Sequence, residues 1–164
     1  MQTIKAARKY LSHDPEVKAN LNSIDEAEIT KDPIRLHELS KHPSIHVKRA
    51  VANNQHTHQI TLHDLSDTND YLTLAALTDH EETHPKTLHK LSKHTNLNIR
   101  MSVSMHPNTS NFTLKTLRND PDEDIRHSAK EALDEIKFGY QSLQKQYPKW
   151  KPEYMHWQPD TNEN

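Results

Sequence analysis

Pairs of leucines recur along the chain at one fixed spacing. The second leucine of each pair follows the first by three positions, and the pair returns every 26 residues without insertion, as Leu36/Leu39, Leu62/Leu65, Leu88/Leu91 and Leu114/Leu117. Other mostly apolar or small positions keep the same step: Val47, Thr73, Ile99 and Ile125; Ala50, Ala76, Ser102 and Ser128; Val51, Leu77, Val103 and Ala129. A fixed period of this length is typical of repeat arrays, in which each unit packs against its neighbours.

Each period contains the pattern of two short helices. The first helix is expected to begin near Pro43, Asn69, Thr95 or Pro121 and to run for about nine residues through the Val/Ile and Ala columns. The second is expected to begin at a threonine column, Thr57, Thr83 and Thr109, with the threonine as N-cap, and to continue through the leucine pair. Isolated helices this short are marginal in water, so packing must hold them.

The two ends of the array depart from this pattern. Residues 1–35 are expected to form an irregular N-terminal helical cap, with helices over 3–11 and 15–21. Asp14-Pro15 and Asp32-Pro33 are N-cap signals with proline at the first helical position, and the second leads into a helix over 34–41.

Residues 36–137 are predicted to hold four 26-residue repeats. The last repeat merges into one long capping helix from Asp120, its expected N-cap, to about Gln146. The apolar register weakens at Gly139, where the helix is open to a break. Residues 138–164 form a tail that contains aromatic residues and proline and is expected to be partly disordered. The predicted fold is therefore all-α, a right-handed α-solenoid of short two-helix repeats.

Composition narrows the functional classes. The 164 residues fit one domain, and 32% hydrophobic content with a mean hydropathy of −1.03 indicates a thin core. A net charge of −2 does not suggest a nucleic-acid-binding protein, because such domains are usually basic. The absence of cysteine excludes disulfides, and a single glycine, Gly139, excludes phosphate-binding loops and the hydrolase nucleophile elbow. No apolar run suits a membrane span or signal peptide, so we expect a cytoplasmic protein.

Two stretches carry a resemblance to a known family. Residues 40–54, Ser-Lys-His-Pro-Ser-Ile-His-Val-Lys-Arg-Ala-Val-Ala-Asn-Asn, and 119–129, Asn-Asp-Pro-Asp-Glu-Asp-Ile-Arg-His-Ser-Ala, resemble units of the bacterial leucine-rich repeat variant family. They also resemble the broader HEAT-like class of α-solenoids. The resemblance covers about residues 30–135. It implies a helical repeat fold and an interaction surface, without a shared activity. The cysteine-bound iron–sulfur cluster of the family's founding example cannot form in a chain without cysteine.

Histidines are the most frequent candidates for chemistry. His80-Glu81-Glu82-Thr83-His84 matches the zinc-peptidase motif His-Glu-x-x-His, which requires both imidazoles on one helix. The repeat register places this stretch in a turn, so the match is interpreted as coincidence.

His37, His63 and His89 form a column with one histidine per repeat. A shared metal site is not expected, because helices of adjacent repeats lie about 8–10 Å apart. The column is interpreted as a polar surface, with a ladder facing a partner as the functional alternative. The 14 histidines together also permit a pH-dependent surface: protonating half of them changes the net charge from −2 to roughly +5.

Arg100 and Arg126, with Lys48 in the same column, are expected to bridge to an acidic residue or a backbone carbonyl of the next repeat, with phosphate contact as the alternative.

The tail carries Tyr147, Trp150, Tyr154 and Trp157 among prolines. Two interpretations stay open: a hydrophobic lid over the last helix, or an anchor for a partner, since Trp and Tyr dominate interface hot spots.

These features predict a non-enzymatic repeat module that binds another protein, as an adaptor, a regulator or an immunity-type inhibitor. No catalytic residue, cofactor or metal is expected. The candidate partner-binding residues are Tyr147, Trp150, Tyr154, Trp157, His37, His63 and His89. The alternative is a nucleic-acid-binding HEAT-like α-solenoid related to DNA repair, as in the alkylpurine DNA glycosylases. A continuous Lys/Arg stripe would favour the alternative, and a mixed or apolar groove would favour a protein partner.

Overall fold

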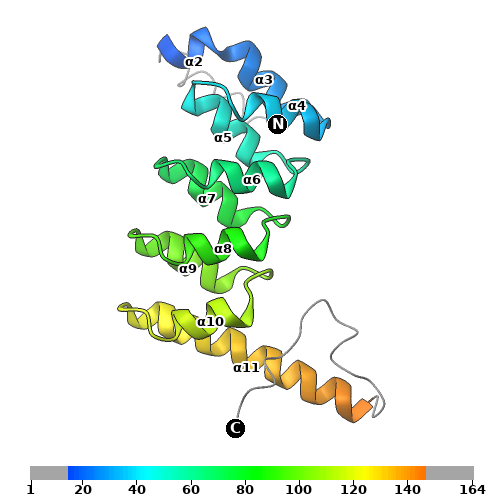
Figure 1. Cartoon of the computed structure of the whole chain (residues 1–164), viewed down its shortest axis with the longest axis vertical. Helices are drawn as coiled ribbons and strands as arrows, with labels where there is room; N and C mark the ends of the chain where they lie inside the picture. The colour runs from blue at the N-terminus through cyan, green and yellow to red at the C-terminus, as the bar shows by residue number, and fades with distance from the viewer. Residues whose placement is uncertain (1–14, 147–164) are drawn as a thin grey trace, which may run out of the picture. The chain divides into compact units, whose positions relative to one another are not determined.

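A computed structural model describes residues 15–146 of the chain. These residues form ten helices and no strand (Figure 1), which confirms the all-α prediction. The helices are α2 (Pro15–Ala19), α3 (Leu21–Ile29), α4 (Pro33–Leu39), α5 (Ile45–Asn53), α6 (Gln59–Leu65), α7 (Tyr71–Asp79), α8 (Pro85–Leu91), α9 (Leu97–Met105), α10 (Asn111–Leu117) and α11 (Glu123–Gln146).

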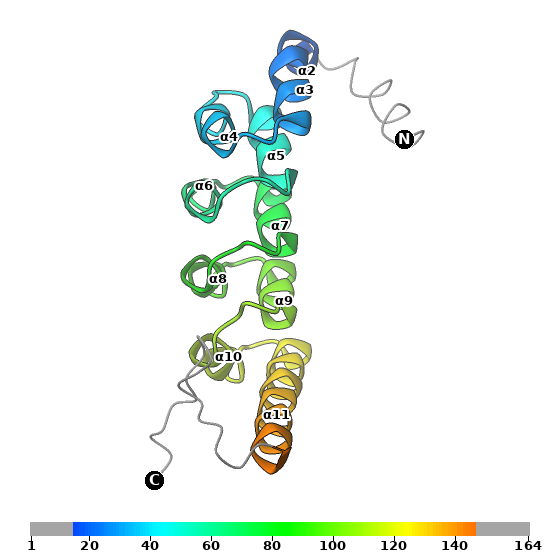
Figure 2. The same cartoon turned by 90° about the vertical axis from the view of Figure 1, so that its right-hand side faces the viewer.

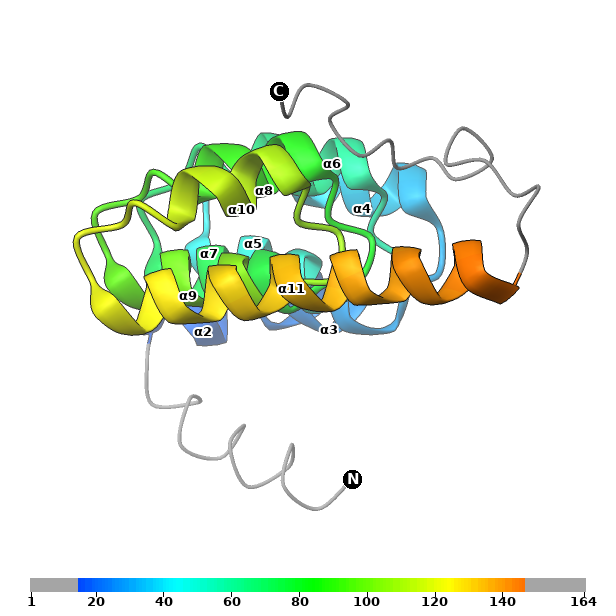
Figure 3. The same cartoon turned by 90° about the horizontal axis from the view of Figure 1, so that it is seen from below.

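The chain divides into two compact units, residues 1–83 and 84–164, where its length alone suggests one domain. In the first unit, α3, α5 and α7 pack side by side in one layer, and α4 and α6 lie in a second layer (Figure 2). In the second unit, α9 and α11 form one layer, and α8 and α10 form the other (Figures 2 and 3). Each unit is therefore a two-layer helical packing around its own apolar interior.

The recurring apolar columns form these interiors. In the first unit, Leu36, Leu62 and Leu77 are fully buried, as are Leu88 and Val103 in the second. Burying one such side chain stabilises a fold by about 1.5–3 kcal/mol, which short helices require because they are not stable alone. The packing role assigned to these columns is confirmed.

Helices α5, α7, α9 and α11 each begin two residues later than expected, because a different polar residue caps them. Ser44 Oγ accepts a hydrogen bond from the His46 backbone N–H at 3.3 Å, and Asn96 Oδ1 accepts one from Asn98 N–H at 2.9 Å. The prediction that Asp120 caps the last helix is wrong. Asp122 Oδ1 accepts from the N–H groups of Asp124 and Ile125, at 3.1 and 3.2 Å.

The predicted threonine N-caps of α6, α8 and α10 are also wrong. The N-caps of α6, α8 and α10 are His58, His84 and Ser110, one residue later. The threonine hydroxyls point back instead and donate to carbonyls six residues earlier: Thr57 to Val51 at 2.6 Å, Thr83 to Leu77 at 2.7 Å and Thr109 to Val103 at 2.6 Å. These buried hydroxyls satisfy carbonyls at the ends of α5, α7 and α9 that have no partner within the helix.

The end elements follow the predictions in part. Asp32 caps α4 by accepting from Ile34 N–H at 2.9 Å, with Pro33 at the first helical position, as expected. The helix predicted over 15–21 ends at Ala19, and α3 follows it as an additional helix. The long last helix is confirmed and runs through Gly139 without a break. The helix predicted over 3–11 and the Asp14 cap lie outside the described residues.

Within residues 15–146, no helix combines the length and the apolar character that crossing a membrane requires.

Candidate interaction surfaces

The predicted histidine column lies on α4, α6 and α8. In each helix the histidine (His37, His63 or His89) directly follows the first leucine of the pair. His37 is half-buried, and its Nδ1 lies 3.1 Å from Thr61 Oγ1 and 3.9 Å from Asp64 Oδ2. His63 is exposed. Thr61 lies on α6, the next helix of the same layer. In the second unit, His89 of α8, also half-buried, makes the same kind of contact with Thr113 of α10.

His89 combines two contacts. Its Nδ1 lies 3.1 Å from Thr113 Oγ1, and its ring centroid is 5.3 Å from that of Phe112. Burial lowers the pKa of His89, because it disfavours the charged imidazole, and the nearby charge of Lys93 lowers it further. His89 therefore favours the neutral form more than a free histidine does.

The other four predicted partner-binding residues, Tyr147, Trp150, Tyr154 and Trp157, lie outside the described residues.

The zinc-motif match is a turn, as the register predicts. His80 follows the last residue of α7, and its Nε2 donates to the Asn54 carbonyl at 3.0 Å while Nδ1 accepts from Glu82 N–H at 3.2 Å. Both ring nitrogens are thereby engaged, and the opposed directions of the two bonds fix a neutral tautomer. Throughout residues 15–146, no three His, Asp or Glu side chains are placed to hold a metal ion.

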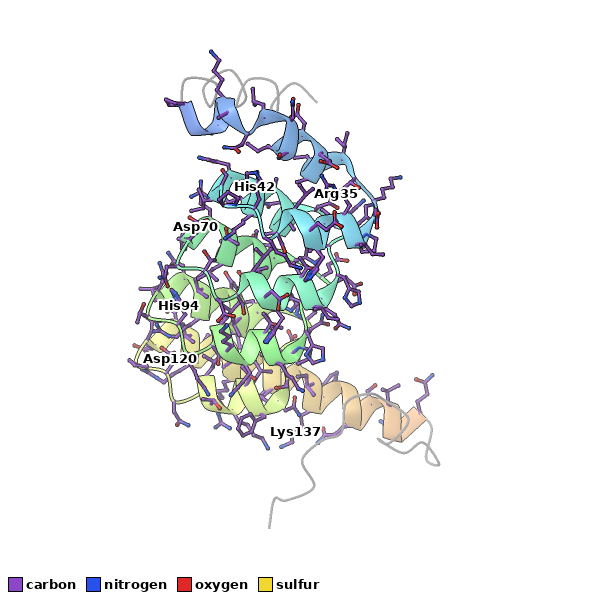
Figure 4. All side chains as sticks on the ribbon, turned by 45° about the horizontal axis from the view of Figure 1, so that its top comes forward. Arg35, His42, Asp70, His94, Asp120 and Lys137 are labelled. Atoms are coloured by element: carbon purple, nitrogen blue, oxygen red, sulfur yellow. The ribbon has the colours of Figure 1, made fainter. Side chains whose placement is uncertain are left out.

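The commonest role of the histidines is one that the sequence did not indicate: acceptance of a backbone hydrogen bond. Several imidazoles accept a hydrogen bond on Nδ1 from the backbone N–H two residues later, as Asp and Asn side chains do in caps and turns. The donors are Ser44 for His42 (3.1 Å), Ile60 for His58 (3.3 Å), Lys86 for His84 (3.1 Å), Asn96 for His94 (3.0 Å) and Asn108 for His106 (3.0 Å). Figure 4 shows His42 and His94 in the turns before α5 and α9.

The repeat columns contain the signal that identifies this role. Asp32, His58, His84 and Ser110 occupy one column, and all four accept from a backbone N–H at the start of the next helix. His42, Thr68, His94 and Asp120 occupy another, and each accepts from the N–H two residues on. Histidine alternates with ordinary capping residues, so most of these imidazoles are structural.

The arginines are tied into the fold. Arg100 Nε and Nη2 donate to the two Asp120 carboxylate oxygens at 2.7 and 3.0 Å, which confirms the predicted bridge to the next repeat. Arg126 donates to the Asp120 and Pro121 carbonyls at 2.8 Å, but these belong to the turn before its own helix. The Arg100 guanidinium holds the pKa of Asp120 below its usual range, against the opposing effect of burial. Figure 4 marks Asp120 and Asp70, the carboxylates with which Arg100 and Arg49 form bidentate pairs, each within one helix layer of its own unit.

A groove of about 410 Å³ lies between the C-terminal ends of α5 and α7, in the first unit. We call it the α5–α7 groove. Its walls include Ala52, Asn53 and Gln55 on one side and Ala76 and His80 on the other. Three exposed carboxylates, Asp79, Glu81 and Glu82, also line it, and no lysine or arginine does. The groove is therefore polar and negatively charged.

A second groove, of about 360 Å³, lies between the end of α9 and the middle of α11, in the second unit. We call it the α9–α11 groove. Its lining includes Met105, Pro107, Ala132 and Ile136, with the carboxylates of Glu131 and Glu135 and again no lysine or arginine; Ser104, His106, Thr109, Leu114 and Ser128 complete it. This groove is more apolar than the first.

No protein-family model, curated protein or solved structure matches the chain.

Proposed function

We propose that the chain is an α-solenoid of 26-residue two-helix repeats, of the leucine-rich repeat variant or HEAT-like kind, that binds another protein through its α5–α7 groove. Two series of helix starts support the repeat. Helices α4, α6, α8 and α10 begin at residues 33, 59, 85 and 111, and α5, α7, α9 and α11 begin at 45, 71, 97 and 123. Each step in both series is 26 residues (59 − 33, 71 − 45 and so on).

The observation that carries the proposal is that the same repeat columns build both grooves. Ala52 and Ser104, 52 residues or two periods apart, line the first and the second groove respectively. Ala76 and Ser128, and Asp79 and Glu131, correspond in the same way. A concave site that recurs with the repeat is a property of the scaffold, and repeat proteins use such surfaces to bind partners.

The charge of the α5–α7 groove favours a protein partner over nucleic acid. Phosphate recognition depends on available Lys and Arg side chains, whereas carboxylates repel phosphate. Arg35 is paired with Glu26 and Glu38, and Arg49 and Arg100 are paired with aspartates. A protein segment that presents Lys or Arg side chains to Asp79, Glu81 and Glu82 complements this groove.

The histidine column is not part of this groove. None of His37, His63 and His89 lines it. They keep their place as partner-binding candidates on a separate surface, and a role for them requires contacts outside the α5–α7 groove.

Site-specific photo-crosslinking in the full chain tests the proposal. A photoreactive amino acid replaces Gln55, which lines the groove, or Gln59 on α6, which is exposed and does not. In a lysate of the source cell, we expect one protein to be crosslinked from position 55, undiminished by nuclease and absent from position 59. The Glu82→Lys variant should weaken that crosslink, because it reverses a charge at the groove.

Two outcomes would contradict the proposal. Nuclease-sensitive adducts from position 55 would favour the alternative of a nucleic-acid-binding solenoid. The same adducts from both positions, or none that Glu82→Lys diminishes, would show that the groove is not the binding surface.

A further inference from the structure

The α9–α11 groove differs from the α5–α7 groove, its counterpart in the first unit, because apolar residues replace polar ones in its lining. Met105 occupies the column of Asn53, Pro107 that of Gln55, and Ala132 that of His80. Met105 is 64% exposed, although a methionine side chain gains free energy when it is covered. The groove is an apolar surface with nothing over it in residues 15–146.

Helix α11 extends this surface beyond the groove. Helix α9 ends at Met105, and Glu131 occupies the corresponding position of α11, 26 residues later. The remaining 15 residues, 132–146, add about 22 Å of helix at 1.5 Å per residue. Figures 1 and 3 show this half of α11 projecting past α9 and α10. It carries a stripe of half-buried apolar side chains: Ala132, Leu133, Ile136 and Leu143.

The chain itself supplies an occupant of matching chemistry. The 18 residues after Gln146 begin Tyr147-Pro148-Lys149-Trp150-Lys151-Pro152. Trp150 has a lysine on either side, and the groove has the carboxylates of Glu131 and Glu135 beside its apolar lining. A tryptophan beside two cations therefore complements an apolar surface beside two anions, in both burial and charge.

The length of the segment also fits. From Gln146 back to Ile136 is ten residues of helix, or about 15 Å. The four residues from Tyr147 to Trp150, extended, span about 13–14 Å, and the indole side chain adds to this reach. Pro148 favours an extended residue before it and ends a helix, so a change of direction after Gln146 is consistent with the sequence.

We propose that the segment after Gln146 folds back within the same molecule onto the α9–α11 groove, with Trp150 against Ile136 and Lys149 and Lys151 beside Glu131 and Glu135. This inference does not rest on the proposed function, because it concerns a different groove and needs no partner.

Tryptophan fluorescence tests the contact directly, because both tryptophans of the chain, Trp150 and Trp157, lie in the segment. In the full chain with Trp157→Phe, Trp150 is the sole reporter. We expect its emission to lie blue of that of the urea-unfolded chain and its quenching by acrylamide to be several-fold weaker. Adding Ile136→Asp should move both readouts most of the way to their unfolded values.

Phe138→Asp is the matched control. Phe138 lies two residues from Ile136 on the same helix, is 74% exposed and does not line the groove, so its substitution should leave Trp150 emission unchanged. Glu135→Lys, at an exposed position, provides a second test that does not remove apolar packing, and it should also increase the quenching. Circular dichroism establishes that each variant retains its helices.

Three results would overturn the proposal: Trp150 emission equal to that of the unfolded chain, equal effects of Ile136→Asp and Phe138→Asp in folded protein, or a blue shift that disappears on dilution. The last result would assign the groove to a second copy of the chain rather than to its own segment.

Discussion

Arg49 on α5 and Asp70, the N-cap of α7, form a bidentate ion pair, with Nη2–Oδ1 and Nε–Oδ2 distances of 2.6 and 2.8 Å. The same carboxylate accepts from the Thr73 N–H at 2.9 Å and from its hydroxyl at 2.7 Å. One side chain thus both starts α7 and ties it to α5. The Asp70 side chain is only 9% exposed, so its loss would leave several partly buried donors without this acceptor.

We predict that Asp70→Ala destabilises the first unit by about 2–4 kcal/mol. Loss of an N-cap costs about 1 kcal/mol, and loss of hydrogen bonds to a charged partner adds about 1.5–3 kcal/mol. Urea unfolding followed by circular dichroism measures the change. Glu82→Ala is the control, since a substitution of an exposed side chain changes stability by about 0.5 kcal/mol or less. Equal effects of the two substitutions would contradict the assignment.

The same pair gives the unfolding free energy an acid dependence. The hydrogen bond from Arg49 lowers the pKa of Asp70, and those from Thr73 add to the shift, although burial opposes it. Below about pH 3.9 the unfolded chain therefore takes up a proton that the folded chain resists. The stabilisation is complete above that pH and is lost as pH falls through the lower, folded-state pKa. Asp70→Asn should reduce this loss in acid titrations of stability.

The features that were predicted correctly from the sequence are those that recur with the 26-residue period. Leu36, Leu62 and their equivalents were placed in the interior because burial requires an apolar residue in every repeat. A bridge from Arg100 to an acidic residue or a backbone carbonyl of the next repeat was predicted, because a charged column beside the core has few ways to be satisfied. Both features depend on the period itself, which the sequence displays directly.

Features that depend on side-chain direction were predicted less well. Thr57 and His58 are adjacent, and both are polar, so the pattern alone did not distinguish the N-cap from the residue that closes the preceding turn. Threonine is a common cap, whereas histidine is not, and propensity therefore favoured the wrong residue. The α9–α11 groove was not predicted, because its lining depends on which side chains of α9 and α11 face each other, and the repeat pattern alone does not show this.

We predict that Phe112→Ala raises the pKa of His89 toward 6.5. The two ring centroids lie 5.3 Å apart, and burial is the largest cause of the lowered pKa of His89. Removing the Phe112 ring admits water, which stabilises the charged imidazole. Titration of the histidine ring signals by NMR measures the shift.

Lys93→Gln is a useful comparison, because it removes the second cause of the shift and should raise the same pKa by a smaller amount.

The lowered pKa of His89 also affects the free energy of unfolding. Because the folded chain disfavours protonation of His89, this group reduces stability as pH falls through and below about 6.5, and Phe112→Ala should make that pH-dependent loss smaller. An unchanged His89 titration in Phe112→Ala would contradict the burial argument.

We predict that the histidine caps stabilise the helices that they begin. His58 and His84 each accept a backbone hydrogen bond on Nδ1, from the Ile60 N–H at 3.3 Å and the Lys86 N–H at 3.1 Å. Loss of an N-cap costs about 1 kcal/mol. The double variant His58→Ala, His84→Ala should therefore lower the unfolding free energy by about 2 kcal/mol, as measured by urea unfolding.

The chain supplies its own replacement for these caps. Asp32 stands in the same column and caps α4 by accepting from the Ile34 N–H at 2.9 Å. Aspartate is among the preferred N-cap residues, so the double variant His58→Asp, His84→Asp should be at least as stable as the unaltered chain. His56→Ala is the control, because the His56 ring contacts the Gln55 side chain at 3.5 Å rather than a backbone N–H, and its loss should cost about 0.5 kcal/mol or less. Equal losses in the control and in the double alanine variant would contradict the assignment of the caps.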